Sequence, residues 1–189
     1  MAAILGALKI ATWRWLLACL AIVLLLNSTA KAEVLRLAVS TPAVTKGDPF
    51  ERYTGGSVKS AVFDGLTQIS LAGEVTAALA VEWSALSDTE WLFRLRPDVH
   101  FQNGLPLTAA SIVAELDYLC SSEGKKSWMA QQLATIRSAR AIDDLAFTIL
   151  TVEPDPLLPR RLSQLNVIDM ASWKKAGALA FSENPVGTG

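Results

Sequence analysis

The sequence contains few of the residue types that catalysis and metal binding require. It holds one histidine, His100, and two cysteines, Cys19 and Cys120. A Ser-His-Asp hydrolase would have to use His100, and a zinc site needs three or four Cys, His or carboxylate ligands at a suitable spacing. No P-loop, GxGxxG or CxxC motif occurs. We therefore predict no catalytic residue, no metal site and no cofactor, and we interpret His100 as a partly exposed structural residue in a loop.

The sequence also lacks an apolar run long enough to cross a membrane. The longest run covers residues 15–26, whereas a membrane-spanning helix needs about 20 residues. Lys9 and Arg14 precede this run and Ala-Lys-Ala follows at residues 30–32, which is the arrangement of a secretory signal peptide. We predict a signal peptide over residues 1–32, cleavage after Ala32 and a periplasmic protein. An uncleaved membrane anchor is the alternative.

Positive and negative charges are almost equal in number, with 17 Lys and Arg against 18 Asp and Glu. The formal net charge is −1 and becomes −4 when Lys9, Arg14 and Lys31 leave with the signal peptide. Basic residues otherwise form isolated pairs, such as Lys125-Lys126 and Lys174-Lys175. A mildly acidic chain without a basic cluster is poorly suited to bind nucleic acid, so we predict no nucleic-acid partner. Cleavage also removes Cys19 and leaves Cys120 without an intramolecular disulfide partner.

The stretch from residue 90 to residue 120 gives the clearest structural signal. Trp91, Phe93 and Leu95 alternate with polar or smaller residues, which predicts a strand with one bulky apolar face. Asn103-Gly104 supplies residues that can adopt positive φ in the following loop. Thr108 stands at an N-cap position, and apolar residues then recur at helical spacing. We predict a helix from residue 109 to residue 120, with Glu115 and Asp117 in solvent.

Further strands and helices are predicted on both sides of this stretch. The predicted strands cover residues 34–40, 66–70, 81–85, 136–142 and 146–152. The predicted helices cover residues 58–63, 128–133, 154–162 and 172–175, the last of them capped by Ser172. Asp64 is interpreted as a turn residue whose carboxylate binds nearby backbone amides. Together these elements predict a mixed α/β fold.

Four stretches of the sequence resemble one known family. In the first, the residues of "W-x-F-x-L-R-x-x-V-x-F-x-x-G-x-P-L-T-A" are Trp91, Phe93, Leu95, Arg96, Val99, Phe101, Gly104, Pro106, Leu107, Thr108 and Ala109. Residues 62–66, 77–83 and 185–189 match "V-F-D-G-L", "P-A-L-A-x-x-W" and "P-V-G-T-G", with Ala77 in place of proline. The sequence is similar to the solute-binding proteins of ATP-binding-cassette importers, in the peptide/nickel class. It departs from the pattern at Gln102-Asn103, where the family commonly has His-Asp, and at Ser111, where it commonly has Asp.

The resemblance implies a type II periplasmic-binding-protein fold that is only partly present. It places the start of a first lobe at residues 33–48, a small α/β subdomain at residues 49–177 and a return to the first lobe at residues 178–189. Family members are longer and have a second lobe. We therefore expect that the chain is a truncated N-terminal fragment.

The resemblance also implies a non-enzymatic function. Its members bind a peptide or a related solute, such as a nickel chelate, haem or a sugar, and dock on a membrane permease, and we expect a monomer. Ser40, Thr41 and Pro42 are the candidate ligand contacts, although the same residues could simply end a strand. The alternatives are a secreted α/β interaction domain without a transport role, a non-functional product, or a secreted hydrolase that depends on His100.

Overall fold

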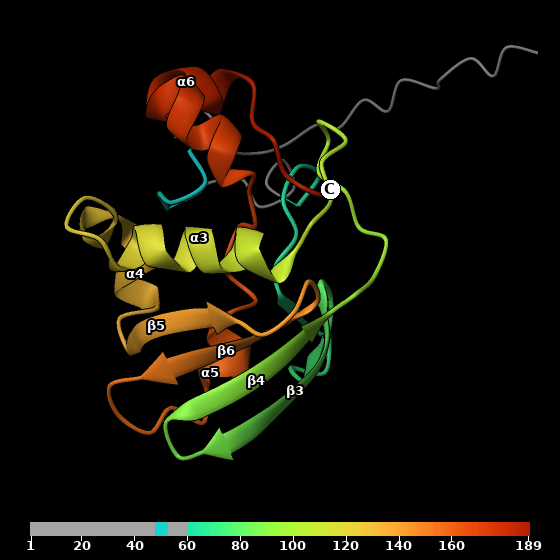
Figure 1. Ribbon diagram of the computed structural model, residues 1–189, viewed down its shortest axis with the longest axis vertical. Coiled ribbons are helices and arrows are strands. Elements are labelled where there is room, and N and C mark those ends of the chain that lie inside the picture. The colour runs from blue at the N-terminus through green and yellow to red at the C-terminus, as the bar shows by residue number, and fades with distance from the viewer. Residues whose placement is uncertain (1–47, 53–59) are drawn as a thin grey trace, which may run out of the picture. The chain divides into compact units, whose positions relative to one another are not determined.

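The computed structural model describes residues 48–52 and 60–189 (Figure 1). The predicted signal peptide, the predicted strand at residues 34–40 and the candidate ligand contacts Ser40, Thr41 and Pro42 lie outside these residues. Within them, no helix is long and apolar enough to cross a membrane. The described residues combine helices with strands, which confirms the predicted mixed α/β class.

A four-stranded antiparallel sheet is the centre of the described structure (Figure 1). Its spatial order is β3-β4-β6-β5. The strands are β3 (Ala80–Ser87), β4 (Glu90–Leu95), β5 (Ile136–Ala141) and β6 (Ala146–Thr151). Strands β3 and β4 form one antiparallel hairpin, and strands β5 and β6 form another. The pairing of β4 with β6 joins the two hairpins.

One face of this sheet carries the apolar core. Phe93 of β4 lies opposite Phe147 of β6, and their rings stack at a centroid distance of 5.5 Å. Trp91 lies opposite Ile149 on the same face, because side chains two residues apart in a strand share a face. The other face carries the exposed pair Arg94–Glu82, with 3.8 Å between Arg94 Nε and Glu82 Oε2. The predicted bulky apolar face of β4 is therefore confirmed.

Helix α3 (Ala109–Cys120) covers the apolar face over β5 and β6 (Figure 1). It begins as predicted at Thr108, whose side chain accepts a hydrogen bond from the backbone N–H of Ser111 at 3.3 Å. Ser111 Oγ in turn accepts from the backbone N–H of Thr108 at 3.4 Å. This reciprocal capping box binds two backbone donors at the helix start. Ser111 thus caps the helix although it replaces the acidic residue that is common in the family.

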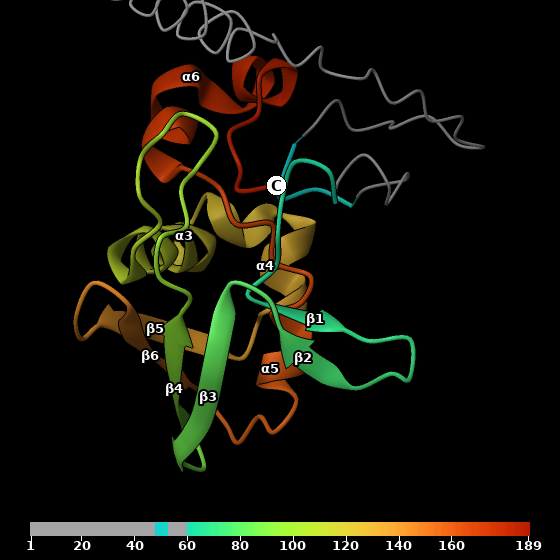
Figure 2. The same ribbon diagram turned by 90° about the vertical axis from the view of Figure 1, so that its right-hand side faces the viewer.

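A second, two-stranded sheet is formed by β1 (Thr67–Ile69) and β2 (Val75–Ala77), which Figure 2 shows projecting beside the main sheet. Two short helices, η1 (Gly124–Lys126) and α4 (Trp128–Gln132), follow α3. Helix α5 (Leu158–Arg161) lies against β1, and Leu66 N donates to Leu162 O at 3.2 Å just beyond it. The predicted helix over residues 154–162 is therefore much shorter than expected.

Helix α6 (Met170–Glu183) is longer than the helix that the sequence predicted for residues 172–175. Its cap is Asp169, so the predicted capping role of Ser172 is wrong. Gly177 interrupts the helix with a φ of 76°, which glycine adopts readily because it lacks a Cβ. The predicted helix over residues 58–63 is also not formed in its described part, since residues 60–62 are turns and Phe63 is irregular.

Aromatic side chains of α6, α3 and residues 48–52 pack together in one cluster. The ring of Phe50 lies 5.1 Å from that of Tyr118 and 5.0 Å from that of Trp173, and Trp173 lies 5.3 Å from Phe181. Aromatic pairs at such distances add about 0.5–1.5 kcal/mol each beyond the burial of their surface. The cluster therefore joins segments that the chain separates by more than 100 residues.

Candidate functional site

Three of the four sequence motifs meet in one hydrogen-bonded unit, which we call the motif junction: residues 62–66, 101–104 and 185–189. Gln102 connects two of them, because its backbone N–H donates to Gly187 O at 2.9 Å and its Oε1 accepts from Gly187 N at 2.8 Å. Gln102 Nε2 also donates to Gly189 O at 2.9 Å. Figure 1 shows the C-terminal end beside the loop after β4. Gln102 therefore connects the loop after β4 to residues 187–189 through both its backbone and its side chain.

Asp64 holds the third motif in the junction. Its Oδ2 accepts a hydrogen bond from Thr188 Oγ1 at 2.9 Å, and its backbone oxygen accepts from Val167 N at 3.0 Å. Gly189 N also donates to Val62 O at 3.1 Å. The hydroxyl that Asp64 binds is 124 positions away in the sequence, whereas the sequence indicated only nearby backbone amides as its partners. Asp64 connects distant segments instead.

The junction requires glycine at residue 187. A Cβ added to Gly187 would lie 2.1 Å from Val62 O and 2.7 Å from Cδ1 of Phe63. Both distances are shorter than atoms can approach, and one of the neighbours is backbone. The two backbones therefore meet so closely because residue 187 has no side chain.

The loop after β4 contacts the start of α6 through Asn103. Its Nδ2 donates to Asp169 Oδ2 at 2.8 Å, while Asp169 also accepts from the backbone N–H groups of Ala171 and Ser172. The hydroxyl of Ser172 also donates to Asp169 Oδ2, at 2.7 Å. Burial acts to raise the pKa of Asp169, but the Ser172 hydroxyl and the other hydrogen bonds outweigh it and hold the pKa below its ordinary value. The positive φ expected for the Asn103-Gly104 pair occurs at Gly104, with a φ of 83°.

Glu115 of α3 is buried against the segment that leads into α6. Its side chain has no exposed surface, so the prediction that it would face solvent is wrong. Glu115 Oε2 accepts from the backbone N–H of Ile168 at 3.2 Å, and Oε1 has no hydrogen-bond partner. Burial raises the pKa of Glu115 well above its ordinary value, against the smaller opposing effect of the Ile168 hydrogen bond. The carboxyl group is therefore biased towards its protonated form.

A polar cavity of about 300 Å³ adjoins the motif junction. The polar residues that line it include Asp64, Thr67, Gln68, Ser163 and Asn166. Asn166 Nδ2 donates to Pro49 O at 2.5 Å, whereas its buried Oδ1 has no hydrogen-bond partner. Carboxylate, amide and hydroxyl groups of this kind bind polar ligands by hydrogen bonds.

The structure places His100 away from this cavity. Its side chain is exposed, and Nδ1 lies 3.3 Å from the backbone oxygen of Asp98. The residue forms an isolated bridge with Pro106. This arrangement agrees with the interpretation of His100 as a loop residue. Among residues 48–52 and 60–189, no three His, Cys, Asp or Glu side chains are grouped so that they could hold a metal ion.

Sequence reasoning missed most of the residues that hold the motif junction. Gln102 and Asn103 were noticed as departures from the family pattern, and this was the one signal that could have marked them. Nothing in the local sequence distinguishes Asp169 or Glu115 from exposed acidic residues. Their roles follow from partners that lie 53 or more positions away along the chain.

Comparison with known proteins supports the resemblance seen in the sequence. A family model described as bacterial extracellular solute-binding proteins, family 5 Middle, matches residues 74–189, which is more than half of the chain. The chain belongs to this family. The matched residues include β4, α3 and residues 185–189 of the motif junction. These elements therefore belong to the part of the chain that the family model describes.

Curated relatives of this family 5 protein include regulators and a binding protein. It is 31% identical over 150 residues to the HTH-type transcriptional regulator SgrR of Photorhabdus laumondii, and 27% identical over 123 residues to a putative binding protein of Haemophilus influenzae. These alignments cover 78% and 57% of this chain, but 25% and 24% of the relatives. The chain therefore spans about a quarter of the length of the curated relatives it matches.

Solved structures show the same fold. OppA of Burkholderia pseudomallei matches with a TM-score of 0.69 at 23% identity, over 79% of this chain and 33% of that protein. MoaA of A. tumefaciens R10, in complex with mannopinic acid, matches with a TM-score of 0.65 at 28% identity, over 78% and 31%. NikA of Brucella suis, in complex with Fe(III)-EDTA, matches with a TM-score of 0.67 at 24% identity, over 79% and 31%. The predicted peptide/nickel class and the predicted partial type II periplasmic-binding-protein fold are both confirmed.

Proposed function

We propose that this protein is the solute-binding component of an ATP-binding-cassette importer in the periplasm, that it binds a peptide or a related small polar solute, and that it acts without catalysis. The observation that carries the proposal is the motif junction, where three family motifs form one hydrogen-bonded unit around Gly187. The family match and the solved structures named above support the same class. Docking on a membrane permease is part of the proposal.

Ser40, Thr41 and Pro42 remain our proposed ligand contacts, and the polar cavity beside Asp64 is a second candidate region. The proposed solutes follow from three solved structures of this fold. MoaA holds mannopinic acid, NikZ of Campylobacter jejuni holds Ni(L-His), and OppA of Haemophilus influenzae holds the nonapeptide RPPGFSPFR. All three carry several hydrogen-bonding groups. A polar cavity of about 300 Å³ lined by hydroxyl, amide and carboxylate groups suits part of such a ligand.

Thermal unfolding tests this proposal on the secreted protein purified with its natural C-terminus. The probes are trialanine, the Ni(L-His) complex and mannopinic acid. A ligand at 100 times its Kd adds about 2.7 kcal/mol to the free energy of unfolding, which raises the Tm of a protein of this length by roughly 5–10 °C. Ser40→Ala and Thr41→Val should reduce this rise, whereas the exposed control Ser122→Ala should not. An unchanged Tm with every probe would contradict solute binding.

We also propose that the protein is a monomer and that a second lobe follows Gly189. The proposed division of the chain is residues 33–48, 49–177 and 178–189. The coding sequence downstream of Gly189 tests the lobe, because several hundred further codons in frame would supply it. Transport is tested by deleting the gene, which should abolish uptake of the solute that raises the Tm. His100→Ala should leave that uptake unchanged.

A second candidate function is solute sensing without transport. The observation that favours it is the similarity to proteins named HTH-type transcriptional regulators, which reaches 31% identity over 150 residues. The two functions differ in location, because an importer's binding protein must leave the cytoplasm. Cell fractionation followed by mass spectrometry of the N-terminus separates them. A periplasmic protein that begins at Glu33 favours the importer, and a cytoplasmic protein that begins at Met1 favours the sensor.

A further inference from the structure

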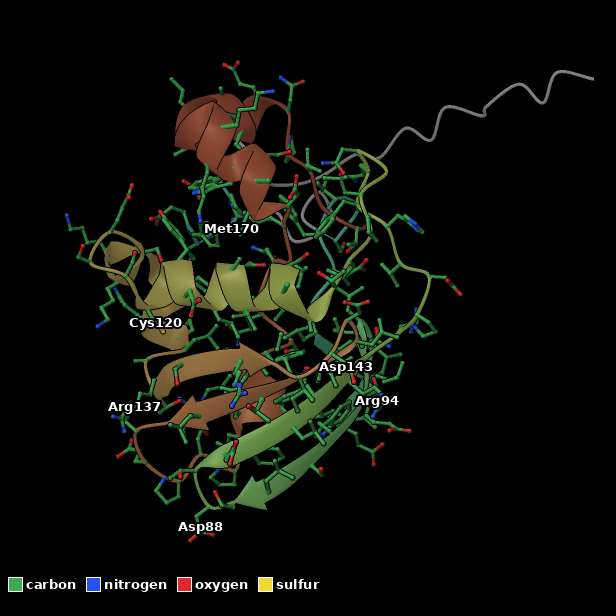
Figure 3. All side chains as sticks on the ribbon, viewed as in Figure 1. Asp88, Arg94, Cys120, Arg137, Asp143 and Met170 are labelled. Carbon is green, nitrogen blue, oxygen red and sulfur yellow. The ribbon has the colours of Figure 1, made fainter. Side chains whose placement is uncertain are left out.

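A second cavity lies beside the C-terminal half of α3. Its volume is about 240 Å³, it opens to the surface, and it is lined by the C-terminal half of α3, by α4 and by the start of β5. Figure 3 labels Cys120 where the end of α3 approaches α4 and β5. We call this space the Cys120 cavity. None of the residues that form the motif junction or the polar cavity lines it.

The inner walls of the Cys120 cavity are apolar. Leu119, Leu133 and Ile136 are buried, and Leu116 and Ala130 complete the wall between the two helices. The thiol of Cys120 is directed towards the backbone oxygen of Ile136, with 3.6 Å between sulfur and oxygen. Water inside a cavity needs two to four polar partners, which these walls do not offer. An apolar ligand would therefore gain by burying its surface there.

The rim of the Cys120 cavity carries a single charged side chain. Lys125 lines the cavity and is exposed, as are its neighbours on the rim, Gln131 and Ala134. Lys125 belongs to neither of the two ion pairs found within the described part of the chain. An apolar space with a lysine ammonium at its mouth is complementary to a molecule that has an apolar body and one anionic end.

We propose that the Cys120 cavity binds a medium-chain aliphatic carboxylate, with the alkyl chain between α3, α4 and β5 and the carboxylate beside Lys125. A volume of about 240 Å³ holds roughly eight groups of about 30 Å³, the share of one water molecule in the liquid. Burial of the alkyl chain therefore supplies most of the affinity, and Lys125 favours ligands whose exposed end is anionic.

Protection of the Cys120 thiol by octanoate tests this proposal. The experiment uses the full chain with Cys19→Ser, so that a thiol-specific reagent reports on Cys120 alone. Octanoate should slow the modification of Cys120 at least tenfold at saturation, because the chain fills the space beside the sulfur. Acetate, which has the charge without the chain, should not protect. Trialanine at the same concentration should not protect either, which separates this site from the proposed solute site.

Two variants test the parts of the site separately. Lys125→Met should weaken protection by octanoate about two- to fivefold, the range of an exposed ion pair, and leave protection by octanol unchanged. Its matched control is Lys126→Met, since Lys126 is exposed and does not line the cavity. Ala134→Phe places a ring at the exposed rim and should abolish protection, with circular dichroism to confirm that the variant is folded.

Three results would overturn the proposal. The first is an absence of saturable protection by octanoate in the folded protein. The second is an equal loss of octanoate affinity in the Lys125 and Lys126 variants, which would indicate a general attraction of anions to the surface. The third is undiminished protection in folded Ala134→Phe, which would place the bound octanoate elsewhere.

Discussion

Replacing Glu115 by glutamine should change how the stability of this protein depends on pH. The wild-type carboxyl group is fully buried on α3, and its one hydrogen bond comes from the backbone N–H of Ile168. Glutamine has the same shape and keeps a side-chain oxygen that can accept this bond. It carries no proton that titrates. The substitution therefore isolates the ionisation of Glu115 from its packing.

The sign of the effect follows from where the proton binds. In the unfolded chain the carboxyl group ionises near its ordinary pKa of 4.5, whereas burial keeps it protonated to higher pH in the folded protein. Above pH 4.5 the folded state thus binds more protons, and the free energy of unfolding falls as the pH rises towards the folded pKa. The slope is about 1.4 kcal/mol per pH unit, or roughly 3–6 °C in Tm per pH unit.

Urea denaturation of the wild type, Glu115→Gln and Asp117→Asn between pH 5 and pH 8 measures this slope. Asp117 is the matched control, because it lies on the same helix and is exposed. The wild type and Asp117→Asn should lose stability with rising pH relative to Glu115→Gln. Parallel profiles for the wild type and Glu115→Gln would refute the conclusion that burial of Glu115 displaces its pKa.

Three further predictions concern the motif junction and the start of α6. Gly187→Ala should lower the free energy of unfolding by about 1–3 kcal/mol, because the new methyl group meets Val62 O; an unchanged urea midpoint would contradict this close approach. Thr188→Val should cost about 0.5–1.5 kcal/mol, and a double-mutant cycle with Asp64→Ala should show that the two losses are not additive. Asp169→Ala should cost about 0.5–2 kcal/mol by removing the α6 cap. Since the pKa of Asp169 is lowered, its contribution is complete above its ordinary pKa of 3.8 and is lost as the pH falls through the lowered value, so the wild type and Asp169→Ala should converge in acid.

Elements with a strong periodic pattern could be predicted from the sequence. The alternation at Trp91, Phe93 and Leu95 gave β4, and Thr108 gave the start of α3. The signals behind these predictions involve residues at most a few positions apart, so no knowledge of the fold is needed to read them. The predicted cap of α6 was wrong because the local signal was weak. Asp169 and Ser172 are both suitable N-cap residues, and the hydrogen bond from the distant Asn103 favours Asp169 as the cap.

The sequence by itself determined the family, the central strand and the helix after it, because motif order and side-chain periodicity are properties of neighbouring residues. The tertiary structure decided which polar residues hold the protein together. Gln102 meets Gly187, Asp64 meets Thr188 and Glu115 meets Ile168 across 53 to 124 positions of sequence. The tertiary fold determines which of these distant residues come into contact. Burial then raises the pKa of Glu115, which the sequence alone predicted to be exposed.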